Sequence, residues 1–235
     1  MRAFVDLHCH TSASFDSLAG PVSVVRAAAA RGITHLAITD HDRIEGALRA
    51  RAAAPEGLTV IVGEEVKTAD GDLIALFLER AVAPGRPAVE TIAEVRAQGG
   101  LVGIPHPFDR FRGSMLVDPR LEAMGALVDW VEAWNARVIG GRGNERAAAF
   151  ARELGLPGVA VSDAHSVLEV GVACTVVEGD PSTPQGMLAA LTNVELVPGR
   201  ASYIVRGLTP IAKLVNRAKG NRRVPRSPAG SAGPA

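Results

Sequence analysis

The sequence has 235 residues, of which 47% are hydrophobic, and its 25 basic residues balance 25 acidic ones. This composition excludes wholesale disorder, and no apolar run reaches the ~18 residues that a membrane span needs. The two cysteines, Cys9 and Cys174, cannot form a disulfide framework, which is typical of a reduced cytoplasmic protein. We therefore expect one large domain, located in the cytoplasm and without membrane contact.

The balanced charge hides an asymmetry along the chain. All acidic residues lie at or before Glu195, and seven basic residues follow from Arg206 onward, so the first 205 residues carry 18 basic and 25 acidic groups, a net charge of −7. A body of that sign argues against a general nucleic-acid binder. We predict a main domain over residues 1–205, a basic helix over 206–221 and a disordered tail over 222–235, which is rich in Pro, Ser, Gly and Ala.

Short β-branched segments alternate with Ala-, Arg- and Glu-rich segments along the main domain. The predicted strands are Ala3–His8, Ile33–Thr39, Leu58–Val66, Asp72–Leu78, Gly100–Ile104, Leu127–Ala133, Gly158–Ser162 and Val172–Val177. The predicted helices are Pro21–Arg31, Arg43–Ala53, Ala88–Gln98, Gly143–Leu154 and Pro184–Thr192. This alternation predicts a parallel α/β sheet or barrel. We favour the barrel because polar residues follow many strands, and a barrel brings all strand ends to one mouth.

Two strand ends carry pairs of metal-ligand residue types. His8 and His10 follow the first strand and project to one side because strand side chains alternate with period two, whereas Cys9 points to the other side as a small buried hydrophobe. Asp163 and His165 repeat the same spacing after a later strand. Imidazole and carboxylate groups are the usual ligands of Zn, Mn or Fe, so these pairs predict a metal site.

Three further segments supply the same residue types. His41 closes the second strand, Glu65 lies inside an otherwise apolar strand, and His106 stands between two prolines after another strand. A buried unpaired carboxylate is costly, and a metal ion removes that cost. His35 lies at the opposite end of its strand, and we interpret it as structural.

These segments resemble, in their order, the motifs of the polymerase and histidinol phosphatase family, known as the PHP domain family. The similar segments are Asp6-Leu7-His8-Cys9-His10-Thr11, Asp16, Thr39-Asp40-His41, Glu65, His106 and Ser162-Asp163-Ala164-His165. Each segment is short, but the order at successive strand ends is specific. The resemblance runs over most of the chain, from Phe4 to Cys174.

The resemblance implies a distorted (β/α)7 TIM-like barrel that binds two or three divalent ions (Zn, Mn or Fe). It implies one ion on His8, His10, Glu65 and Asp163, a second on Asp16, His41 and His165, and a middle ion on Glu65 and His106. Glu132 lies in a Glu-x-x-Asn segment typical of the family, as a ligand or as a support for the ligands.

The fourth strand departs from the family pattern. Many relatives have a histidine there, but in the segment Asp72–Phe77 the equivalent position is Ile74. Isoleucine cannot bind a metal, so we expect the middle site to be weak, completed by water or empty.

These residues predict a metal-dependent phosphoesterase that hydrolyses a phosphate ester by a metal-activated hydroxide. Asp163, His165 and His41 are the expected catalytic residues, and Arg110, Arg112 and Asn135 the expected substrate-binding residues. The expected substrate is a nucleotide, the end of an oligonucleotide or another short nucleic acid, or a small phosphomonoester.

Two alternatives stay open. One is a non-catalytic, metal-stabilised module that binds a partner through its basic end. The other is an amidohydrolase-like C–N hydrolase on a similar barrel, which would act on a cyclic amide. The sequence does not predict the oligomeric state.

Overall fold

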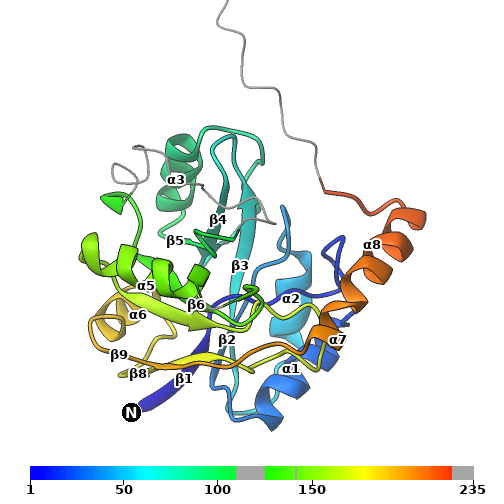
Figure 1. Cartoon of the computed structure of the whole chain (residues 1–235), viewed down its shortest axis with the longest axis horizontal. Helices are drawn as coiled ribbons and strands as arrows, with labels where there is room; N and C mark the ends of the chain where they lie inside the picture. The colour runs from blue at the N-terminus through cyan, green and yellow to red at the C-terminus, as the bar shows by residue number, and fades with distance from the viewer. Residues whose placement is uncertain (110–124, 141, 224–235) are drawn as a thin grey trace, which may run out of the picture.

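A computed structural model describes residues 1–109, 125–140 and 142–223 (Figure 1). In this part of the chain one sheet contains β1 (Arg2–Asp6), β2 (His35–Ile38), β3 (Thr59–Lys67), β4 (Asp72–Leu76), β5 (Leu101–Ile104), β6 (Trp130–Asn135), β7 (Gly158–Val161), β8 (Cys174–Glu178) and β9 (Val194–Val197). The helices are α1 (Pro21–Ala30), α2 (Glu45–Ala52), α3 (Ala88–Ala97), α5 (Arg142–Glu153), α6 (Pro184–Ala190), α7 (Tyr203–Arg206) and α8 (Leu208–Ala218). Among these described helices, none has the length and apolar character needed to cross a membrane.

The sheet has the strand order β7-β6-β5-β4-β3-β2-β1-β8-β9 and curls into a nearly closed barrel. Residues just beyond β1 and β7 meet in a bridge between Cys9 and Ala164, and the Ala160 N–H of β7 donates to the Thr175 hydroxyl of β8 at 2.8 Å. The predicted α/β barrel is therefore confirmed. The strands are not all parallel, however: β4 runs antiparallel to both of its neighbours, and β8 runs antiparallel to β1.

Two apolar clusters hold the barrel together. The outer cluster packs α1, α2, α3 and α5 against one face of the strands, with Val25, Ala47 and Val95 among its buried residues. The inner cluster fills the barrel and includes Ile74 and Trp130. Because both strand faces are covered, strands such as β2 are buried along their whole length, which is why the sequence shows apolar runs rather than alternation.

One glycine of the barrel interior is required by close packing. A Cβ atom at Gly103 on β5 would lie 2.0 Å from the Trp130 ring on β6. Trp130 is fully buried, so its indole fills the space that a side chain at position 103 would need.

The predicted elements occur in the structure with ends shifted by a few residues, and two elements were not predicted. β9 is a short edge strand with half-exposed and exposed residues alternating, so it lacks a strong apolar signal. α7 is a single turn begun by the Ser202 side chain, which accepts a hydrogen bond from the Ile204 N–H. The helix expected within residues 206–221 is α8.

The expected disordered tail needs a correction at its first residues. Arg223 is half-buried and forms ion pairs with Asp72 and Asp42. These two carboxylates lie far from Arg223 in the sequence, so the local composition of the tail did not reveal them. Residues 224–235 lie outside the described part of the chain, and the division at residue 205 stays a prediction.

Candidate metal centre

The ligand-type residues gather at one mouth of the barrel, at the carboxyl ends of its parallel strands. His8 and His10 follow β1, His41 follows β2 and forms a bridge with Glu65 of β3, and His165 follows β7. Asp163 follows β7 as well, His106 follows β5, and Asp16 lies in the loop between His10 and α1. All of them are buried. The barrel thus brings together every metal-ligand residue that the sequence predicted.

The first group of donors consists of His8, His10 and Glu65. The two Nε2 atoms of the histidines lie 2.9 Å apart, and each lies 3.4 Å from Oε2 of Glu65. Asp163 joins this group, since its Oδ1 lies 3.6 Å from His8 Nε2 and 3.5 Å from His10 Nε2. This set matches the four ligands expected for the first ion.

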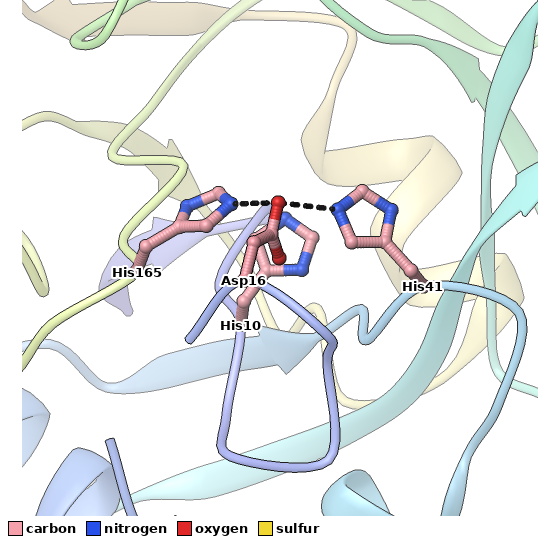
Figure 2. Close-up of side chains that lie close together, drawn as sticks. All are labelled: His10, Asp16, His41 and His165. Atoms are coloured by element: carbon pink, nitrogen blue, oxygen red, sulfur yellow. Dashed lines mark ion pairs between the residues drawn. The ribbon is translucent and has the colours of Figure 1, made fainter. Parts of the chain in front are cut away.

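The second group consists of Asp16, His41, His165 and His10. Figure 2 shows the Asp16 carboxylate between the two outer imidazoles, with Oδ2 at 3.4 Å from His41 Nε2 and 3.3 Å from His165 Nε2. The His10 ring lies beside both: it stacks on His41 at a centroid distance of 4.5 Å and is tilted against His165 at 4.2 Å. His10 therefore belongs to both groups, whereas the sequence placed it in one.

The distances between these donors fit shared metal ions. Ligand atoms held at about 2.0–2.1 Å around a tetrahedral ion lie about 3.3 Å from one another, and the donor separations above cluster near that value. Asp16 Oδ1 is buried and has no hydrogen-bond partner among the described residues, which is costly without a cation. Imidazoles and carboxylates are the donor set of Zn, Mn and Fe.

The pKa values of these groups also reflect their mutual contact. Burial alone would raise the pKa of Glu65, but the surrounding imidazoles, His41 first, hold it well below its usual range. Burial likewise opposes ionisation of Asp16, and His165 and His41 keep its pKa well below the usual range. Burial, with the charges of His165 and His41, lowers the pKa of His10. Although burial opposes protonation, Asp163 and Glu132 raise the pKa of His8 well above its usual range, and Glu65 and Asp16 raise the pKa of His41. Only a deprotonated imidazole binds a cation, so metal binding would release the protons of these two histidines.

Glu132 supports the first group without being one of its donors. Its Oε1 lies 2.6 Å from His8 Nδ1. A carboxylate at this distance holds the proton of a neutral imidazole on Nδ1, so that Nε2 is the nitrogen whose lone pair can bind a metal. Its Oε2 accepts hydrogen bonds from the His106 N–H at 2.9 Å and from the Asn135 amide at 2.9 Å. The supporting role, one of the two roles considered for Glu132, is the one that these contacts show.

Asn135 is placed differently from the sequence expectation. Its Nδ2 donates to Glu132 Oε2 and, at 3.0 Å, to Asp163 Oδ2, and its side chain is fully buried. Both amide hydrogens are thus directed at carboxylates of the centre rather than at a substrate. Asn135 orients Asp163, and its expected role in substrate binding does not follow from this geometry. Arg110 and Arg112, the other two expected substrate-binding residues, lie outside the described residues.

The backbone is strained at three positions of the centre. Asp42, His106 and Asp163 have φ angles of 55°, 27° and 50°, a region that side chains other than glycine rarely adopt. Such conformations persist where surrounding contacts fix them, and they are common at functional sites. At Asp163 the strain aims the carboxylate at His8 and His10.

The C-terminal helix α8 holds the loop that carries Asp16. The buried Asn216 directs its Nδ2 at three backbone carbonyls of that loop, those of Ser14 (3.1 Å), Phe15 (3.1 Å) and Ser17 (3.0 Å). About two hundred residues separate the helix from the loop, so no local pattern in the sequence could have revealed this contact. In Figure 1, α8 lies on the right of the molecule beside the dark blue loop between β1 and α1, on the side away from the N-terminus.

Replacement of Asn216 by alanine tests this support. We expect Asn216→Ala to weaken divalent-ion binding at the second donor group by about 10- to 100-fold, because lost support of a ligand typically costs that much affinity. Calorimetric titration of metal-free protein measures the effect, with Arg217→Ala on the exposed side of the same helix as the control. Equal metal affinities in the two variants, with both proteins folded, would contradict the assignment.

His106 and Ile74 define the altered middle site. His106 Nε2 lies 3.4 Å from Glu65 Oε1, but in the described part of the chain His106 belongs to neither close donor group. Ile74 pairs directly with Glu65 across β3 and β4 and is fully buried in the inner cluster. The isoleucine thus lies beside Glu65, where a histidine would supply a donor.

Several residues that support the centre were not predicted from the sequence. Glu169 accepts hydrogen bonds from the His165 N–H at 3.1 Å and from the Ser166 hydroxyl at 2.9 Å, and it pairs with Arg137 at 2.8 Å. Its position four residues after His165 was the only local signal. Arg137 in turn donates to the Thr209 hydroxyl of α8 at 2.7 Å, so α8 supports both Asp16 and His165.

Fold and site together define a barrel with a candidate polynuclear metal centre at its mouth, the arrangement of metal-dependent hydrolases. The PHP domain model matches residues 6–101, and the PHP-associated model matches residues 141–195. These matches together cover more than half of the chain. The chain belongs to the PHP family, as its motifs indicated.

Individual relatives agree with this assignment. An uncharacterized protein of Methanocaldococcus jannaschii is 33% identical over 147 residues, which are 56% of this chain and 81% of the relative. A 5'-3' exoribonuclease of Haemophilus influenzae is 45% identical over 64 residues, but these are only 27% of this chain and 23% of the enzyme.

A solved structure shows the same fold. It is a two-domain protein of Bacteroides vulgatus, described as containing a predicted PHP-like metal-dependent phosphoesterase. The match has a TM-score of 0.72 at 20% identity and covers 85% of this chain and 65% of the other. At this identity the likeness shows the fold alone.

Proposed function

We propose that this protein is a metal-dependent phosphoesterase whose two outer donor groups each hold a divalent ion. The observation that carries the proposal is the pair of donor groups that share His10 and are also joined by a contact between Glu65 of the first group and His41 of the second. Two neighbouring divalent ions, when bound, lower the pKa of water and offset the charge that develops on phosphoryl oxygens. Phosphate-ester hydrolysis needs both effects.

The chain's own residues hold and orient this chemistry. Glu65 belongs to the first donor group and also contacts the second, with Oε2 at 3.4 Å from His8 Nε2 and His10 Nε2 and at 3.0 Å from His41 Nδ1. Asp163, oriented by Asn135, accepts the proton of the attacking water. The proton that Asp163 takes from water is then available to the leaving oxygen. His41 and His165 are the most exposed of the ligand residues, at 7% and 8%, so they lie on the side from which a substrate enters.

A pocket beside His165 gives the non-phosphate part of the substrate a place. Its volume is about 290 Å³, and Leu18, Val167 and Ile211 contribute apolar walls while Ser23 and Ser166 contribute hydroxyl groups. That size suits a small organic group rather than a long chain. Together with the exoribonuclease relative, the pocket supports a nucleotide, a short nucleic-acid end or a small phosphomonoester as substrate.

A substrate screen tests the proposal. The probes are an aryl phosphate monoester, a bis-aryl phosphate diester, a 5'-phosphorylated oligonucleotide and a cyclic amide, each with Mn, Zn or Fe and with a chelator. We expect hydrolysis of at least one phosphate ester, lost on chelation and restored by one of the metals.

Two outcomes would support the alternatives instead. Hydrolysis of the cyclic amide alone would indicate an amidohydrolase-like enzyme. Metal binding without turnover of any probe would indicate a non-catalytic module that binds a partner.

A further inference from the structure

Arg223 reaches the mouth of the barrel from the end of the described chain. Its guanidinium contacts Asp72 through two nitrogens, Nη2 to Oδ1 at 2.8 Å and Nη1 to Oδ2 at 3.1 Å, and its Nε lies 3.5 Å from Asp42 Oδ2. The Arg223 side chain is 18% exposed, and the two aspartates are almost completely buried. We call Asp42 and Asp72 the rim carboxylates.

The rim carboxylates lie next to metal-ligand residues. Asp42 follows His41 directly, and its N–H donates to the Glu65 carbonyl at 3.2 Å. Asp72 faces the same side of β4 as Ile74, which pairs with Glu65. An anionic substrate that approaches the centre therefore meets two negative charges besides those of the ligand residues, and Arg223 is a cation that pairs with both.

The fold directs Arg223 to this position. Helix α8 ends at Ala218, and Gly220 then adopts a φ of 79° while the Asn221 N–H donates to the Asn216 carbonyl at 2.9 Å. This is a glycine-terminated helix end, which reverses the chain. The Asn221 side chain donates to the Ala13 carbonyl at 3.0 Å. This hydrogen bond ties the chain two residues before Arg223 to the loop that leads to Asp16.

We propose that Arg223 determines specificity for anionic substrates by neutralising the rim carboxylates beside the metal centre. This inference rests on the proposed phosphoesterase function. The bidentate contact uses the fork geometry of arginine, and a buried ion pair that loses one partner leaves an uncompensated charge. Loss of Arg223 leaves two negative charges at the rim, which repel a phosphate group before it reaches the ions.

Full-length variants test the proposal by phosphate binding and by turnover. Arg223→Ala removes the cation, and Arg222→Ala is the control because Arg222 is an exposed neighbour of equal charge. The double variant Arg223→Ala/Asp72→Asn restores the net charge of the three rim groups. Calorimetry measures the Kd of inorganic phosphate on metal-loaded protein, and kinetics measures KM and kcat for a phosphate ester.

We expect Arg223→Ala to raise the Kd of phosphate and the KM about tenfold, with kcat within about threefold of the parent, since a tenfold change corresponds to about 1.4 kcal/mol. Arg222→Ala should change neither constant more than about twofold, and the double variant should recover most of the lost affinity. Thermal unfolding and metal content establish that each variant is folded and loaded, and Arg223→Gln removes the charge but keeps a polar side chain if Arg223→Ala does not fold.

Two results would overturn the proposal. One is equal phosphate affinity in Arg223→Ala and Arg222→Ala. The other is a double variant as impaired as Arg223→Ala, which would show that the guanidinium acts otherwise than by neutralising Asp72. Because phosphate binding requires no turnover, the inference fails or stands separately from the proposed function: a parent protein that binds phosphate but hydrolyses no ester contradicts only the latter.

Discussion

Glu65→Gln should lower kcat/KM at least about a thousandfold and cause loss of metal from both donor groups. Its carboxylate oxygens lie within 3.4 Å of nitrogens from four imidazoles, those of His8, His10, His41 and His106. Glutamine keeps the shape but replaces one oxygen with an N–H donor and removes the negative charge that offsets the ions. Metal analysis of the purified variant, beside a phosphate-release assay, measures both effects.

Glu64→Gln is the matched control for this change. Glu64 is the neighbouring residue on the opposite face of β3, and its carboxylate accepts a hydrogen bond from the Val82 N–H at 2.9 Å rather than contacting the centre. Burial raises the pKa of Glu64 to about 8, so glutamine imitates the protonated side chain that the fold prefers. Activity should stay within about threefold of the parent. If Glu65→Gln behaved like this control, Glu65 would not be a metal ligand.

Asp163→Asn should lower turnover by at least about a hundredfold, the loss typical when a metal ligand is disturbed. Asp163 lies 3.6 Å from His8 and 3.5 Å from His10, and Asn135 fixes its other oxygen. His165→Ala should do similar damage through the second group, because it removes one of the two imidazoles at Asp16. Steady-state kinetics with phosphate release measures each loss.

His106→Ala separates the outer groups from the altered middle site. Ile74 supplies no donor beside Glu65, so we expect the loss of His106 to cost less than either Asp163→Asn or His165→Ala. If His106→Ala were as harmful as Asp163→Asn and also removed one ion from the metal count, the middle site would be occupied. The inference from Ile74 would then be wrong.

Much of the centre was predictable because its residues follow strand ends. The period of two along a strand placed His8 and His10 on one side and Cys9 on the other, and the structure shows Cys9 fully buried in the outer cluster. The barrel geometry then brings strand ends from distant parts of the sequence to one mouth. Where a predicted ligand residue lies inside or just after a strand, its residue type and its position in the sequence were sufficient to predict that it lies at this mouth of the barrel.

The residues that support the centre were not predictable, because they do not follow strand ends. Asn216, on helix α8, contacts the loop that carries Asp16. Arg223, in the segment after α8, contacts Asp72. Both contacts join residues that are far apart in the sequence. Their composition alone predicted a basic helix and a disordered tail, because charge and Pro/Gly content say nothing about distant partners. The sharing of His10 between both donor groups likewise depends on how the loop after β1 folds back, which only the structure shows.

A stepwise metal titration of metal-free protein, with bound ions and phosphate release measured in the same samples, tests most directly whether the two donor groups form a metal centre that hydrolyses phosphate esters. We expect no release by the metal-free protein, and release that rises as the donor groups of His8, His10 and Glu65 and of Asp16, His41 and His165 fill with Mn, Zn or Fe. Phosphate release at full rate from metal-free protein, or a protein that binds none of the three metals, would contradict this proposal.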